Sequence, residues 1–241
     1  MGIERGEVMS QDFEGLKQKL VLAHKIMAAA GVLQMNLGHA SVRLPEGDRV
    51  LILGHLHDVG KVFETASVDD LSIMDLDGNH LDGDLEPPGE RYIHSGIYRL
   101  RPDVGAVVHA HPFSAVACTI AGQDILPVGH WGTVFAPKVP VYPSSEQIES
   151  QEMGEDIARV MGDAPAVLLS HHGAASAAKF LEQAVAVMLS LEHAAKLIAE
   201  ASKMGTPIPL PREQIDSDMA VNLDRPSFWQ NPWAFWSSKI A

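Results

Sequence analysis

Apolar residues recur at helical spacing in several segments of the chain. In residues 13–30 they fall every three or four positions, and Gly31 follows where a helix C-cap would lie. The same period predicts further helices over residues 89–101, 144–162 and 179–201. The first of these ends before Pro102, because proline disfavours helical geometry at the residue that precedes it. A Ser-Ser-Glu start and Gly162 mark the two ends of the second.

Short apolar runs bounded by turn residues predict strands between these helices. The runs are residues 41–44, 49–53, 71–83 with an Asp-Gly hairpin turn, 104–110, 138–143 and 166–170. The run "VGAVVHA" at 104–110 is apolar nearly throughout, which is typical of a buried strand. This mixture of strands and helices indicates the α/β fold class.

The length and composition fit a single globular domain. We expect one domain over residues 1–210, followed by a Trp-rich tail, residues 211–241, that packs on the domain or on a neighbouring subunit. No apolar run approaches the roughly 20 residues that cross a bilayer. The first residues also lack the apolar core of a signal peptide. A cytoplasmic protein is therefore expected.

The charge and the cysteine content narrow the function classes. A formal charge of −13 argues against nucleic acid or an anionic membrane as the main partner. Cys118 is the only cysteine, so thiolate metal clusters are excluded. A metal site in this chain must use nitrogen and oxygen ligands. A small anionic substrate is compatible with the acidic balance, because a metal ion and a few cations outweigh the global field locally.

Two histidines close the buried strand run. His109 and His111 are two positions apart, so in a strand their side chains point to one face, about 6–7 Å apart. A single buried histidine is more often a hydrogen-bonding residue, but a same-face pair at the end of an apolar strand favours metal ligation. His172, at another strand end, is the third candidate ligand. Glu90 begins a predicted helix, where a carboxylate is favoured.

Three segments together resemble the class II aldolase/adducin family over residues 12–205. They are "GHASVR" at 38–43, residues 89–112, and "LLSHHGAA" at 168–175 followed by the helical run 181–198. The resemblance implies a single-domain α/β/α three-layer sandwich with a central, largely antiparallel sheet. It implies a homotetramer with active sites at subunit interfaces. It also makes His109, His111 and His172 metal ligands, and Glu90 either a fourth ligand or an acid/base.

The chain departs from the sugar-phosphate aldolases of this family. His39 stands where they carry Asn, Pro88 and Gly89 stand where they carry two phosphate-binding serines, and the phosphate loop is replaced by "GHLHDVG" at 54–60. Their catalytic Tyr is Trp131 here, after His130. These differences argue against a sugar-phosphate substrate. The pattern is more similar to the decarboxylase branch, which acts on hydroxylated aromatic or pyridine dicarboxylates.

The resemblance therefore predicts a metal-dependent carbon–carbon lyase of aromatic degradation. We expect one Mn²⁺ or Zn²⁺ per subunit, with Fe²⁺ also open, and decarboxylation of a hydroxylated aromatic or heteroaromatic dicarboxylate or a related hydroxy-keto acid. The candidate acids, in order, are Glu90, His39 and His130. The candidate substrate contacts are Arg43, His55, His57 and Tyr142.

Three other functions remain open at this point. The first is an aldolase that acts on a non-phosphorylated hydroxy-keto acid. The second is a non-heme iron oxygenase on the same scaffold. The third is an adducin-type interaction module without a metal, against which the full set of predicted ligands counts.

Overall fold

A mixed sheet of eight strands forms the centre of the protein. The structure, a computed structural model, describes residues 3–223 and 225–240, with the side chains of residues 13–217, 223 and 225–240. The strands follow the order β4-β3-β2-β1-β5-β8-β7-β6, and only β6 and β7 pair in parallel. Their bounds are β1 His39–Arg43, β2 Arg49–Leu53, β3 Leu71–Asp75, β4 His80–Asp82, β5 Ala106–Ala110, β6 Val141–Tyr142, β7 Ala166–Leu169 and β8 Gly173–Ala178.

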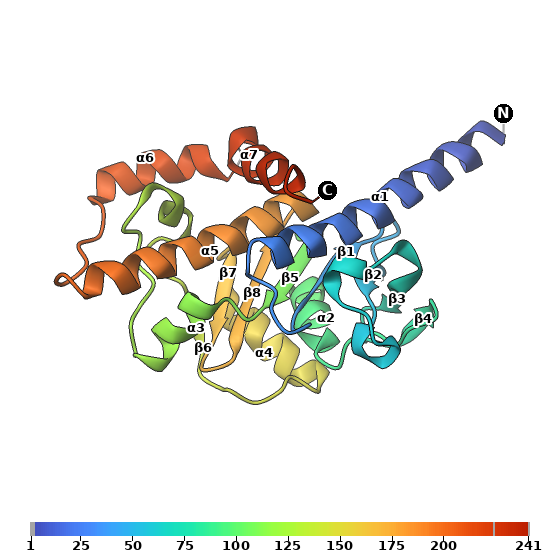
Figure 1. Ribbon diagram of the computed structural model, residues 1–241, viewed down its shortest axis with the longest axis horizontal. Helices are drawn as coiled ribbons and strands as arrows, with labels where there is room; N and C mark the ends of the chain where they lie inside the picture. Colours follow the sequence, from blue (N-terminus) through green and yellow to red (C-terminus); the bar gives the residue numbers. More distant parts are fainter. Residues whose placement is uncertain (1–2, 224, 241) are drawn as a thin grey trace.

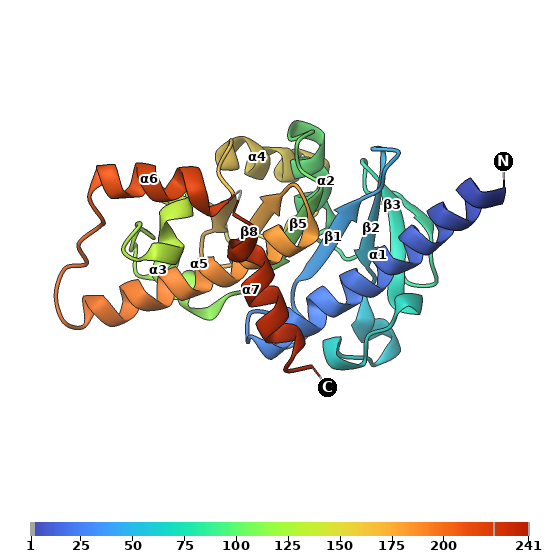
Figure 2. The same cartoon turned by 90° about the horizontal axis from the view of Figure 1, so that it is seen from above.

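Helices cover both faces of this sheet (Figures 1 and 2). Helices α1, α3, α5 and α7 lie on one side, whereas α2 and α4 lie on the other. The helix bounds are α1 Ile3–Ala29, α2 Arg91–Leu100, α3 Phe113–Ile120, α4 Gln151–Met161, α5 Leu181–Ser202, α6 Arg212–Asn222 and α7 Pro226–Ser237. Short 3-10 helices are η1 Leu56–Val59, η2 Phe63–Thr65, η3 Val68–Asp70 and η4 His130–Phe135. This is the predicted three-layer α/β/α arrangement.

Strand β5 is buried on both faces and connects the two cores. Ala106, Val108 and Ala110 belong to the larger core beneath α1 and α5. Val107 belongs to the smaller core beneath α2 and α4, and strand alternation places His109 on that same face. This buried strand therefore places His109 near its C-terminal end, on the face of the sheet that α2 and α4 cover.

Helices α2 and α4 approach so closely that their contact requires glycine. A Cβ added to Gly154 would lie 1.9 Å from the Tyr92 carbonyl oxygen. A Cβ added to Gly96 would lie 2.2 Å from the Gly154 carbonyl carbon. The crossing fixes α2, which follows directly after Glu90, against the segment that leads into α4.

The structure corrects several details of the predicted elements. Helix α4 begins at Gln151 and not near residue 144, because Ser150 accepts a bond from the Met153 N–H and forms the N-cap. Strand β8 has the sequence "GAASAA", whose small residues carry little strand propensity, and the sequence did not predict it. The strand predicted at 138–143 is reduced to Val141–Tyr142.

The Trp-rich tail packs on the outer side of α5. Phe228 is 5% exposed within the larger core, and three tryptophans of α7 pack against that core. These are Trp229, Trp233 and Trp236. The domain boundary at residue 210 stays a prediction. Within the described residues, no helix has the length and apolar character needed to span a membrane.

Buried His24 predicts that stability depends on pH. Its Nδ1 lies 2.8 Å from the Leu20 carbonyl and its Nε2 accepts the Ala40 N–H, and burial lowers its pKa to about 4. The unfolded chain takes up this proton below about pH 6.5, whereas the folded chain resists it until about pH 4. We expect this residue to contribute roughly 3 kcal/mol at pH 7, lost as the pH falls from 6.5 to 4.

Urea unfolding of the metal-free protein between pH 7 and pH 4 checks this prediction. In His24→Gln the free energy of unfolding should fall less steeply over the same interval. An equal slope in the two proteins would contradict the assignment.

Candidate metal centre

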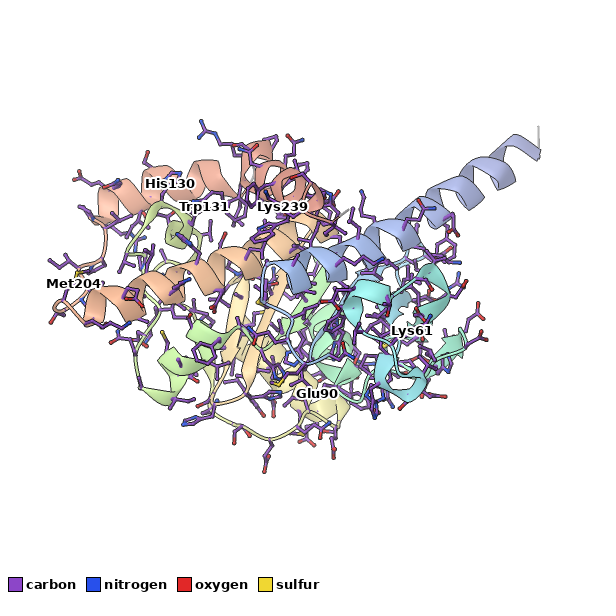
Figure 3. All side chains as sticks on the ribbon, in the orientation of Figure 1. Lys61, Glu90, His130, Trp131, Met204 and Lys239 are labelled. Atoms are coloured by element: carbon purple, nitrogen blue, oxygen red, sulfur yellow. The ribbon has the colours of Figure 1, made fainter. Side chains whose placement is uncertain are left out.

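Four side chains from three segments of the chain converge on the α2 side of the sheet. Ligand atoms of Glu90, His109, His111 and His172 all lie within 4.8 Å of one another. Glu90 directly precedes α2, His109 lies in β5, His111 follows that strand, and His172 closes the β7–β8 hairpin. Figure 3 shows Glu90 below the sheet, on the side away from α5 and α7. These are the four side chains that the resemblance implied as ligands, and the structure brings them together.

The backbone of the β7–β8 hairpin places His172 next to the end of β5. The hairpin loop holds three residues between Leu169 and Gly173, which pair across β7 and β8. Its central residue, His171, takes the left-handed conformation with φ of 59°. A Cβ on Gly173 would lie 2.6 Å from the Ala110 carbonyl oxygen and 3.0 Å from the His111 ring. Glycine is therefore needed where the hairpin meets β5.

The spacing of the donor atoms fits a divalent cation. The Nε2 atoms of His109 and His111 lie 3.1 Å apart, and Glu90 approaches both His109 and His172 at 3.3 Å. Ligands about 2.0–2.1 Å from a tetrahedral ion are separated by roughly 3.3 Å. His109 donates from Nδ1 to the Ala174 carbonyl at 3.0 Å, which leaves the lone pair of Nε2 facing the other ligands.

The charge states of these side chains also suit a divalent cation. Burial alone would raise the pKa of Glu90, but its contacts with His109 and His172 and the Ile148 N–H hold that pKa well below its usual range. Burial and the neighbouring histidines lower the pKa of His111 to about 3. One ionised carboxylate and neutral imidazole form a donor set for a divalent metal ion.

His39 lies directly beside this group. It pairs with His109 across β1 and β5, and the two ring centres are 5.3 Å apart. His39 also lines a small pocket of about 30 Å³ together with His55, His57 and Pro88. The pocket thus brings three of the predicted functional histidines together, next to the metal centre. His55 and His57 both approach the carboxylate of Asp58 and are exposed to solvent.

The two other predicted substrate contacts, Arg43 and Tyr142, are not among the residues that line this pocket. Arg43 is at the opposite end of β1 from His39, about 13 Å away along a strand. Its guanidinium donates to the carbonyls of Gly47, Tyr98 and Val104, so it joins two loops to the last turn of α2. This placement argues against contact with substrate. Tyr142 is in edge strand β6 and pairs with Leu169, near the hairpin that carries His172. Burial and two carboxylates raise its pKa, which keeps the phenol protonated.

His130 is far from Glu90 within the same chain. It lies in η4 next to Trp131, under α6, and Figure 3 shows both residues well separated from Glu90. There it lines a pocket of about 180 Å³ together with Arg225 and Phe228 of the tail. A direct acid role in its own subunit is therefore not supported by its position.

Sequence reasoning missed the residue that anchors the chain after His111. Helix α3 begins immediately after Pro112, which offers no capping side chain. The carboxylate of Glu192, on α5, accepts the Ser114 N–H at 2.9 Å and the Ala115 N–H at 3.2 Å. Its negative charge also matches the positive end of the helix. In the sequence, Glu192 is one acidic residue within a predicted helix, and nothing there indicates that it contacts residues near position 114.

Removing this cap should weaken metal binding. In Glu192→Ala we expect about tenfold lower zinc affinity and a loss of roughly 1–2 kcal/mol in unfolding free energy, because the segment after His111 loses its anchor. Competition titration with a zinc chelator and thermal unfolding measure the two effects. Glu200→Ala, on an exposed part of the same helix, is the control and should change neither. Unaltered zinc affinity in Glu192→Ala would show that Pro112 alone holds His111.

Comparison with known proteins agrees with the geometry. Residues 18–199 match the family described as the class II aldolase and adducin N-terminal domain. The 3,4-dihydroxyphthalate decarboxylase of Arthrobacter keyseri is 36% identical over 86% of this chain and 85% of that protein. The enzyme of the same name from Rhodococcus jostii strain RHA1 is 30% identical over 91% of this chain and 95% of that protein.

A solved structure supports the same assignment. An L-fuculose 1-phosphate aldolase matches with a TM-score of 0.76 at 26% identity, over 85% of this chain and 94% of that chain. The expected resemblance and the expected fold class are thereby confirmed. The chain belongs to the class II aldolase and adducin family.

Proposed function

We propose that this protein is a metal-dependent carbon–carbon lyase that decarboxylates a hydroxylated aromatic dicarboxylate, with 3,4-dihydroxyphthalate as the first candidate. The observation that carries the proposal is the convergence of one carboxylate and three imidazoles beside the pocket that His39 lines. Relatives that cover most of the chain are named for decarboxylation of that compound. An aldolase reading has weaker support, because the replaced phosphate contacts described above disfavour a sugar phosphate.

The reaction requires a place for an electron pair. When the bond between the ring carbon and its carboxylate breaks, carbon dioxide leaves and the ring carbon takes a proton in its place. A divalent cation bound by the four ligands would act as a Lewis acid toward a substrate oxygen. The bond from His109 to Ala174 holds that imidazole in the ligating tautomer.

The neighbouring residues would bind and orient the substrate. His39, buried beside His109, faces the pocket and can hydrogen-bond a phenol or carboxylate oxygen. His55 and His57 are exposed at the rim of the same pocket, where they can meet a second carboxylate. Of the three predicted acids, Glu90 and His39 lie beside the centre in this subunit, and Glu90 is the one proposed to exchange a proton with the substrate.

The identity of the ion and the assembly belong to this proposal. Zn²⁺ and Mn²⁺ both suit a set of imidazoles and a carboxylate, and Fe²⁺ stays open. A pocket of about 30 Å³ is too small to enclose an aromatic diacid, which supports a site completed by another subunit. In a homotetramer of this kind, His130 could act only on the site of a neighbouring subunit. A cytoplasmic location stays a prediction from the sequence.

A carbon dioxide assay tests the function. Purified protein loaded with Zn²⁺ or Mn²⁺ should release one carbon dioxide per molecule of 3,4-dihydroxyphthalate, and the dihydroxybenzoate isomer that forms identifies the carboxylate lost. Removing the metal with a chelator should abolish the release, and adding it back should restore it. Pyruvate formation from a hydroxy-keto acid, or oxygen uptake that depends on ferrous ion, without carbon dioxide release from dicarboxylates, would contradict the proposal.

A further inference from the structure

Hydrogen bonds connect His39 to the interior of the protein. The Nδ1 atom of His39 lies 2.7 Å from Nε2 of His94, and Nδ1 of His94 lies 2.7 Å from the hydroxyl of Ser41. That hydroxyl lies 2.8 Å from the phenol oxygen of Tyr98. His39 is 7% exposed and the other three residues are exposed by 1% or less. We call these four residues the His39 chain.

The spacing of these four residues in the sequence places them on facing surfaces of a strand and a helix. His39 and Ser41 are two positions apart in β1, so both face α2. His94 and Tyr98 are four positions apart in α2, so both face the sheet. The bonds therefore alternate between strand and helix, and they end beside the metal centre because Glu90 directly precedes the same helix.

Tyr98 is the last residue of the His39 chain, and its phenol determines which group donates in each hydrogen bond. The phenol of Tyr98 is buried, and the hydroxyl of Ser41 is the hydrogen-bond partner that the described residues provide for it, at 2.8 Å. Among the described residues, Ser41 is the acceptor within reach. The reverse direction would leave the buried phenol proton without an acceptor, which is unfavourable. Tyr98 therefore donates to Ser41.

Each following bond is then determined. Ser41, having accepted one proton, donates its own to Nδ1 of His94. His94 is fully buried, and burial lowers its pKa well below the usual value, so it carries a single proton, on Nε2. That proton is donated to Nδ1 of His39. The remaining nitrogen of His39, Nε2, must carry the proton of its neutral ring.

We propose that the His39 chain fixes His39 as the tautomer protonated on Nε2, so that this residue presents a permanent N–H donor to the substrate pocket. Ser41, His94 and Tyr98 are positioning residues in this scheme. The role in catalysis rests on the proposed function. The described residues provide no partner for Nε2 of His39, so this donor is available to a phenol or carboxylate oxygen of a substrate.

The chain orients His39 and does not supply protons through it. Passing a proton from His39 to a substrate and refilling it along the chain would leave a tyrosinate at Tyr98. Burial raises the pKa of that phenol far above neutrality, so the charged end state is disfavoured. His39 therefore keeps its proton and stabilises negative charge on a substrate oxygen.

The tautomer can be measured without any substrate. In zinc-loaded protein with ¹⁵N-labelled histidine, two-bond correlations between ring protons and nitrogens distinguish the two neutral tautomers, and His39→Gln identifies the His39 signals. We expect a protonated Nε2 and an unprotonated, hydrogen-bonded Nδ1 on His39. A proton on Nδ1 of His39 would overturn the proposal.

Variants of Ser41 test the role in turnover. Ser41→Ala should lower kcat for 3,4-dihydroxyphthalate about tenfold at unchanged zinc content, because His94 loses the bond that sets its tautomer. Ser41→Thr keeps the hydroxyl and should restore most of the rate. Ser176→Ala removes a buried hydroxyl on the opposite face of the sheet, which donates to Ala184, and is the matched control.

The two arms separate the possible failures. An unchanged kcat in Ser41→Ala, or an equal loss in Ser176→Ala, would overturn the role of the chain in catalysis. If the wild-type protein decarboxylates none of the compounds tested, the proposed function fails. The tautomer of His39 is then still decided by the spectra of the zinc-loaded protein.

Discussion

Replacing His109 with alanine should remove the metal ion and lower decarboxylation more than about a hundredfold. The side chain is fully buried, approaches both Glu90 and His111, and is oriented by the Ala174 carbonyl. Its loss leaves three ligands and removes the central one. Elemental analysis of the purified variant and the carbon dioxide assay measure the two effects.

An exposed histidine provides the control for this experiment. His193 lies on α5, on the opposite side of the sheet from the metal centre, and His193→Ala should keep both metal and rate. Full metal content in His109→Ala would mean that this residue is not a ligand. Full activity in a metal-free His109→Ala protein would contradict a metal-dependent reaction.

A methyl group at Gly154 should destabilise the protein by about 3 kcal/mol or more. Its Cβ would be 1.9 Å from the Tyr92 carbonyl oxygen, and backbone on both sides leaves α2 and α4 no option except to separate. Since Glu90 directly precedes α2, zinc affinity should fall with stability. Urea unfolding and zinc titration of Gly154→Ala measure both changes.

The same substitution in open space should have the opposite sign. Gly15 lies in α1 with no atom near an added Cβ. Gly15→Ala should therefore stabilise the protein by up to about 1 kcal/mol, because alanine is the better helix former. Similar effects of the two substitutions would show that helix propensity, and not the close crossing, decides the result at Gly154.

The sequence predicted which side chains converge at the candidate metal centre better than it predicted which residues line the neighbouring pocket. His109 and His111 could be predicted because an apolar strand run fixes which face each side chain takes. His172 and Glu90 were candidates from their positions at a strand end and a helix start, and the family resemblance then assigned both of them to the site. Arg43 was misplaced because a strand of a few residues has two ends. Periodicity gives the face of the sheet but not the end that a ligand meets.

Contacts between distant elements were the part that could not be read from the sequence. The cap that Glu192 provides to α3 joins residues 77–78 positions apart. The bonds of Ser41 to His94 and Tyr98 likewise depend on how α2 lies across β1. Strand β8 escaped prediction because alanine, serine and glycine have low strand propensity, and its pairing with β5 and β7 outweighs that preference.

The position of His109 in the sheet has a consequence for the motion of the site. His109 belongs to β5, which has strand neighbours on both sides, whereas His55 and His57 lie on a short, exposed turn. Interior strands exchange their amide hydrogens only when most of the protein unfolds, but surface turns open alone. We therefore expect the rim of the pocket to open for substrate and product while His109, and a cation held by it, stay in place.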